Sequence, residues 1–157
     1  MCTVSVIPMP HGGFRVVANR DESHRRPPAT EPAWSMLSGG VRGLWPRDGL
    51  AGGTWIGASE RGRVLAGLNL NLHPAPRLPP RDELISRGLI IPRLLADDRS
   101  LAEAIGSLEL DRFAPFRLIA IEASSGGLRI GEASWDRDGL STTEHRGPAA
   151  SFASSGL

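Results

Sequence analysis

Short runs of β-branched and aliphatic residues, separated by turns that contain glycine, recur along most of this 157-residue chain. Runs of this length joined by so few residues are typical of strands paired in antiparallel hairpins. The strands we expect cover residues 2–9, 14–18, 41–45, 54–59, 63–69, 116–123, 128–135 and 140–145, and residues 149–157 begin another. One helical region interrupts them. The order of strands, helices and strands predicts the α+β class with mostly antiparallel sheets.

The helical region contains two predicted helices. Apolar residues dominate positions 84–95, and Pro92 among them requires either a kink or a late helix start near Ser86. A second helix should begin after Ser100, because Ser100 and Glu103 have the spacing of a capping box, in which each side chain bonds the other residue's backbone N–H.

Size and cysteine content favour one compact soluble domain over residues 1–157, with no linker to divide it. The single cysteine, Cys2, excludes a disulfide framework and a multi-cysteine zinc site, and it suits a reducing compartment. Residues 1–9 lack the basic start and long apolar core of a signal peptide. No run approaches the roughly 18 apolar residues of a membrane span. We therefore expect a cytoplasmic protein without a transmembrane segment.

The charge pattern excludes other classes of function. Lysine is absent, so all 18 basic residues are arginines, and they are interleaved with 17 acidic residues for a net charge of +1. Without a basic stripe we expect no nucleic-acid binding. No histidine or carboxylate pair has metal-ligand spacing, and the glycine pair at 52–53 lacks the ending of a phosphate loop, so we expect no bound metal or nucleotide.

Cys2 is the strongest candidate for a catalytic residue. A hairpin of residues 2–9 and 14–18 would bring Asn19 and Asp21 close to it. If Met1 is removed, Cys2 carries a thiol with a pKa of about 8.5 and an amine with a pKa of about 7.7–8.0, which can accept the thiol proton. Asp21 could orient the amine, and an asparagine amide could stabilise the oxyanion.

The alternative interpretation is that the same residues have structural rather than catalytic roles. Cysteine at a strand start is often a small buried hydrophobe. The asparagines at 19, 69 and 71 all end predicted strands, where asparagine commonly supports turns.

Several motifs occur in a characteristic order. They are Met-Cys-Thr at 1–3, Ala-Asn-Arg-Asp-Glu at 18–22, Ala-Gly-Gly-Thr-Trp-Ile-Gly at 51–57, Gly62, Ala-Gly-Leu-Asn at 66–69, Ser-Arg-Gly-Leu at 86–89 and Ser-Ser-Gly-Leu at 154–157. Together they resemble the NRDE family, named for its Asn-Arg-Asp-Glu motif and also called the transport and Golgi organization 2 family. The resemblance spans nearly the whole chain. Family members usually continue well beyond this length, so we expect residues 1–157 to form the N-terminal part of the family domain.

The resemblance implies an N-terminal-nucleophile hydrolase-like αββα sandwich, in which two stacked antiparallel sheets lie between helical layers. It also implies a distant similarity to the cysteine amidases that cleave bile-salt conjugates and penicillin V. Their site residues correspond to Cys2, Arg20, Asp21 and Asn69. Arginine precedes aspartate by three residues in those amidases but is adjacent to it here. On a regular strand Asn19 and Asp21 would share a face while Arg20 points away, which would leave Arg20 free to form a structural salt bridge.

The residues and the family resemblance together suggest two functions. The first is an N-terminal cysteine amidohydrolase that cleaves a non-peptide C–N bond of a small acylated substrate and needs no cofactor. The alternative is a non-catalytic carrier, because the family is associated with haem trafficking and with lipid or acyl-CoA homeostasis. In the carrier, Cys2 and the loop histidines His11, His24 and His73 are candidate ligands for haem iron.

Overall fold

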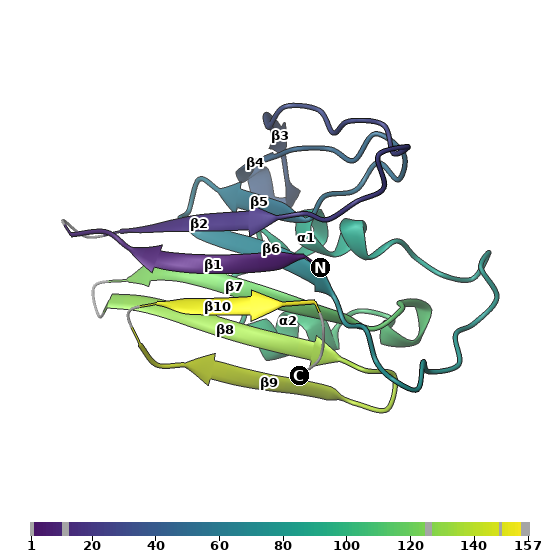
Figure 1. Cartoon of the computed structure of the whole chain (residues 1–157). Coiled ribbons are helices and arrows are strands. Elements are labelled where there is room, and N and C mark those ends of the chain that lie inside the picture. Colours follow the sequence, from purple (N-terminus) through teal and green to yellow (C-terminus); the bar gives the residue numbers. More distant parts are fainter. Residues whose placement is uncertain (1, 11–12, 125–126, 148, 155–157) are drawn as a thin grey trace.

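The computed structural model describes residues 2–10, 13–124, 127–147 and 149–154, which form two antiparallel sheets and a set of helices (Figure 1). The smaller sheet has three strands in the order β10-β1-β2, with bounds Thr3–Pro8 for β1, Phe14–Asn19 for β2 and Ala150–Ala153 for β10.

The larger sheet has seven strands in chain order, β3 to β9, and every neighbouring pair is antiparallel. The strands are β3 (Ala33–Met36), β4 (Arg42–Trp45), β5 (Ile56–Ser59), β6 (Arg63–Asn69), β7 (Phe116–Ser124), β8 (Gly127–Trp135) and β9 (Leu140–His145). The predicted hairpins are confirmed. β3 was not predicted, because four residues at a sheet edge with exposed Trp34 and Met36 show no inside-outside alternation.

The helices are short. A 3₁₀ turn, η2 (Arg87–Leu89), continues directly into α1 (Ile90–Leu94), so the helix starts late, after Ser86, as one of the two predictions had it. Pro92 causes no break, since it lies in the first turn of α1, where its missing N–H has no helical partner to lose. Two further 3₁₀ turns are η1 (Ser38–Gly40) and η3 (Leu110–Arg112).

The predicted capping box is present at α2 (Leu101–Gly106). Glu103 donates its backbone N–H to Ser100 Oγ at 3.4 Å, and Ser100 donates its backbone N–H to Glu103 Oε2 at 3.1 Å. These two bonds satisfy N–H groups that the first helical turn leaves without partners, which explains where the helix begins.

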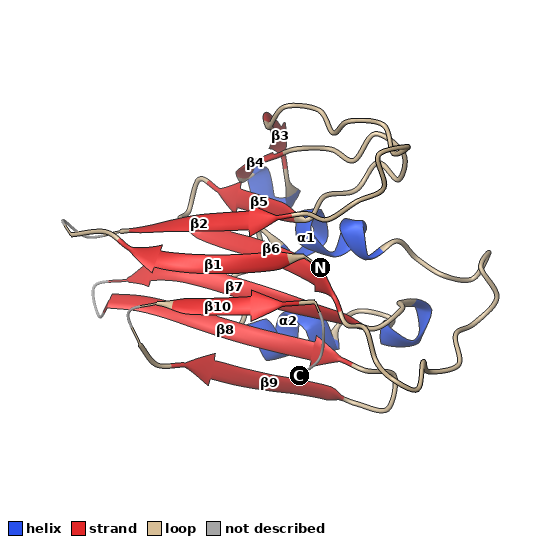
Figure 2. Ribbon diagram, viewed as in Figure 1, coloured by secondary structure: helices blue, strands red, loops and turns tan. Residues whose placement is uncertain are grey.

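The two sheets stack, and helices cover the far face of the larger one (Figure 2). Alternate residues of β1, Val4 and Val6, point into a core shared with Ile119 and Ile121 of β7. A second core, on the other face of the larger sheet, joins α1 and α2 to residues such as Leu118. Layers therefore run from helices to the seven-stranded sheet to the three-stranded sheet.

The α+β class and the two stacked antiparallel sheets are confirmed. The expected αββα sandwich is met only in part. In residues 2–154, apart from the gaps given above, α1 and α2 pack on the larger sheet, and the outer face of the small sheet leaves Ile7 and Val17 about half exposed. None of the helices in these ranges is long and apolar enough to cross a membrane.

Candidate active site

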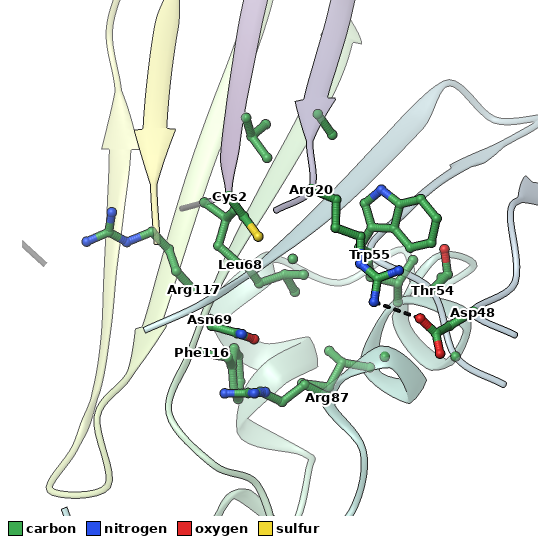
Figure 3. Close-up of a pocket in the computed structure, with 18 of the residues that line it drawn as sticks. Cys2, Arg20, Asp48, Thr54, Trp55, Leu68, Asn69, Arg87, Phe116 and Arg117 are labelled. Atoms are coloured by element: carbon green, nitrogen blue, oxygen red, sulfur yellow. Dashed lines mark hydrogen bonds and ion pairs between the residues drawn. The ribbon is translucent and has the colours of Figure 1, made fainter. Parts of the chain in front are cut away.

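A cavity of about 210 Å³ lies where the ends of β1 and β2 approach the end of β6 and the turn η2 (Figure 3). Cys2, Asn19, Arg20 and Asn69 line it, so four of the five predicted site residues come together. The volume is below the roughly 300–1,000 Å³ usual for drug-sized ligands, so the cavity suits a small molecule or one end of a longer one.

Cys2 is held in place by Ser154, the residue that directly follows β10. Its backbone N–H donates to Ser154 Oγ at 3.1 Å, and the Ser154 N–H donates back to the Cys2 carbonyl at 3.0 Å. Ser154 is only 3% exposed, and its own carbonyl accepts from the N–H of Asn71 at 3.1 Å. Sequence reasoning assigned Ser154 no role, since nothing in the sequence revealed that β10 pairs with β1.

The predicted proximity of Cys2 to the end of β2 is confirmed. Thr3 pairs with Asn19, which brings Asp21 beside Cys2, and the Asp21 N–H donates to Cys2 Sγ at 3.4 Å. The Asp21 side chain is exposed and is not among the residues that line the cavity, so the contact between these two residues runs through the main chain of Asp21.

Arg20 has a different orientation from the one expected on a regular strand. β2 ends at Asn19, so strand alternation does not extend to Arg20, and its side chain lines the cavity instead of pointing away. The guanidinium lies over the ring of Trp55, with Cζ 4.4 Å from the ring centroid (Figure 3). The predicted salt bridge is present, to Asp48 at 2.7 Å, with Glu22 at 2.9 Å.

Asp48 is the centre of this charged cluster, and sequence reasoning did not identify it. It is 6% exposed and accepts two bonds from Arg26, both at 2.9 Å, besides the one from Arg20. The backbone N–H groups of Leu50 and Ala51 add two more, at 3.0 and 2.7 Å. The hydrogen bonds from Arg26, reinforced by those from Ala51, Arg20 and Leu50, hold the pKa of Asp48 far below its usual value, although burial opposes them.

A pair of glycines explains two of the motifs. Gly53 and Gly88 pack backbone against backbone, and the Thr54 N–H donates to the Gly88 carbonyl at 2.9 Å. A Cβ on Gly53 would lie 2.6 Å from the Gly88 carbonyl carbon, so no larger residue fits without backbone movement. This contact ties the 51–57 loop to η2 and sets the position of Arg87, which also lines the cavity.

Asn69 ends β6 with an exposed side chain at the cavity wall, opposite Phe116 of β7. It is thus placed to donate its amide to a group bound beside Cys2. Asn71, two residues on, does not line the cavity.

Of the predicted iron ligands in the described ranges, Cys2 alone lines this cavity. His24 and His73 are exposed loop residues and do not line the cavity, whereas His11 lies outside the described residues. Among the described residues, no three His, Cys, Asp or Glu side chains cluster closely enough to hold a metal ion.

The fold and the site define an α+β protein with two stacked antiparallel sheets and a cysteine-containing pocket at the start of the first strand. The chain belongs to the Transport and Golgi organisation 2 family, whose family model matches residues 1–145. The resemblance drawn from the motifs is thereby confirmed.

Three mammalian proteins are similar to the chain, each 31% identical over 122 residues. They are the Transport and Golgi organization 2 homolog of Mus musculus and the Transport and Golgi organization protein 2 homologs of Bos taurus and Homo sapiens. The alignments cover 75% of this chain and 42% of each relative, so the chain spans less than half of their length.

Proposed function

We propose that this protein is an N-terminal cysteine amidohydrolase with an N-terminal-nucleophile hydrolase-like fold, acting on the C–N bond of a small acylated substrate after removal of Met1. The proposal rests on Cys2, which lines the cavity together with Asn69 and whose Sγ accepts a hydrogen bond from the Asp21 N–H.

The proposed reaction has two steps. Cys2 Sγ attacks the amide carbonyl carbon while the Cys2 amine takes the thiol proton, and Asn69 donates to the developing oxyanion. Collapse of this intermediate breaks the C–N bond, and the amine passes its proton to the leaving nitrogen. Water then attacks the thioester, which releases a carboxylic acid and restores the thiol.

The contact between Cys2 and Ser154 supports the use of an amine. The Cys2 nitrogen lies 3.1 Å from Ser154 Oγ in the intact chain. After removal of Met1, this hydroxyl would face the new amine and restrict its orientation. Ser154 therefore joins Asp21 as a candidate for the group that holds the amine.

Intact-mass spectrometry tests the mechanism directly. Protein beginning at Cys2 and protein retaining Met1 are each incubated with short-chain N-acyl-4-nitroanilides. We expect an acyl adduct and nitroaniline release only from the form that begins at Cys2, and neither product from Cys2→Ala. Equal activity in the form retaining Met1 would contradict the proposal.

Asn69→Ala tests the oxyanion role, with Asn71→Ala as the matched control. Loss of one oxyanion donor lowers kcat by about 10²–10³-fold. We expect this loss for Asn69→Ala and little change for Asn71→Ala, whose side chain is outside the cavity. A similar loss in both variants would remove Asn69 from the site.

A further inference from the structure

The charges around the cavity are unevenly matched. Its lining includes four arginines and two acids, Glu22 and Asp48. Arg20 and Arg26 share Asp48, and Arg117 has Glu132 2.8 Å from its Nε. Arg87 forms no ion pair within the described ranges. Among the four arginines that line the cavity, it is therefore the one whose charge is not matched by a carboxylate in the described part of the chain.

Arg87 also retains most of its hydrogen-bonding capacity. The one protein bond found for it in the described part of the chain is from Nη1 to the Pro115 carbonyl, at 2.8 Å. A guanidinium has five N–H donors, so four have no protein acceptor there. None of its nitrogens is among the fully buried polar atoms without a partner, so solvent or a ligand reaches these donors.

The position of Arg87 links it to the proposed chemistry. Its acceptor, Pro115, precedes Phe116, which is the partner of Asn69 across β6 and β7. The guanidinium therefore lies at the end of these strands where Asn69 faces the cavity, as the close-up shows (Figure 3). Apolar residues Ile90 and Leu118 also line the cavity. Burial lowers the pKa of Arg87, yet a guanidinium stays charged at neutral pH.

We infer that Arg87 binds a carboxylate on the substrate, so that the preferred substrates are small acyl amides carrying a carboxylate near the scissile bond. The inference rests on the proposed function, because Cys2 supplies the reaction. The planar fork of arginine matches the two oxygens of a carboxylate, and a half-buried, unpaired guanidinium gains more from such a ligand than one already bound to Asp48. A carboxylate there would neutralise the unmatched charge.

Equilibrium binding tests the inference without relying on catalysis. The Cys2→Ala protein is titrated by calorimetry with N-butanoylglycine and with succinanilic acid, which place the carboxylate on the amine side and the acyl side of the amide. Each probe is compared with its neutral N-methylamide. We expect at least one carboxylate probe to bind about 10–100-fold more tightly than its neutral counterpart.

Arg87→Met in the same background should abolish this difference, whereas Arg87→Lys should retain part of it. Arg93→Met, which removes an exposed arginine of α1, is the matched control and should leave the difference unchanged. Failure of both carboxylate probes to bind below about 10 mM, or a preference that survives Arg87→Met, would overturn the inference. Carboxylate binding without any acyl adduct in the Cys2 protein would support the Arg87 site and contradict only the proposed hydrolase.

Discussion

Arg20 and Arg87 reach the same cavity from different walls, and their surroundings differ. Arg20 stacks on Trp55 and pairs with Asp48 and Glu22, so its charge is matched within the protein. Arg87 has a main-chain carbonyl as its protein partner in the described part of the chain. The same residue type thus serves the structure on one wall and is available to a ligand on the other.

The difference arises from the backbone around Asp48. Two consecutive N–H groups, from Leu50 and Ala51, donate to the Asp48 carboxylate and hold it in place independently of the arginines. This carboxylate pairs with both Arg20 and Arg26, which line the cavity. Arg87 lies next to Gly88, whose backbone packs against Gly53, and within the described part of the chain it has a main-chain carbonyl and no carboxylate as partner.

Removing the carboxylate at position 48 should have the largest effect. Asp48→Asn removes the buried countercharge of Arg20 and Arg26 and leaves them with the more exposed Glu22. Breaking a buried ion pair costs about 3–5 kcal/mol, and we expect about 3 kcal/mol because both arginines are partly exposed. Urea denaturation measures this loss. Asp82→Asn, at an exposed site, should change stability by less than about 0.5 kcal/mol, and a similar value for Asp48→Asn would refute the structural role of the cluster.

The low pKa of Asp48 also predicts a dependence on pH. Because the folded-state pKa lies below the unfolded value of about 3.9, the stabilisation is complete above that value and is lost as pH falls towards the folded pKa. The free energy of unfolding should therefore decline from about pH 5 downwards. The decline should be shallower in Asp48→Asn. Parallel curves for the two proteins would show that other carboxylates dominate the acid transition.

The glycine contact that positions Arg87 is the next most sensitive point. Gly53→Ala places a methyl group 2.6 Å from the backbone of Gly88 and should cost about 1–3 kcal/mol through overpacking. Gly106→Ala, at a glycine with open space around its Cβ, should cost nothing measurable by thermal denaturation. If the pocket depends on this contact, Gly53→Ala should also weaken binding of the carboxylate probes. Unchanged stability and binding would separate the glycine pair from the site.

Replacing Arg20 and Arg87 in turn by methionine directly compares how much each arginine contributes to stability. Arg20→Met should lower the free energy of unfolding by about 1–2 kcal/mol, since Asp48 and Trp55 lose a partner. Arg87→Met should change it by less than about 1 kcal/mol, because a half-buried charge without an ion pair is replaced by an apolar side chain. Equal losses in the two variants would show that Arg87 is as structural as Arg20.

Some features of the site could be predicted from the sequence because they are local. The β1–β2 hairpin follows from two β-rich runs and a glycine turn, and it places Asn19 beside Cys2. The salt bridge of Arg20 was foreseen, but its acceptor was not, since Asp48 is 28 residues away in a loop without a periodic pattern. Ser154 and Arg87 were missed as site residues for the same reason.

Local patterns therefore determined the α+β class, the hairpins, the cap of α2 and the candidate nucleophile, because each depends on residues within a turn or a hairpin of one another. The tertiary structure alone decided which distant side chains surround Cys2. β10 brings Ser154 to Cys2 from 152 residues away, and the contact between Gly53 and Gly88 brings Arg87 to the cavity. Such contacts depend on sheet stacking and charge pairing across the whole chain, and no short stretch of sequence specifies them.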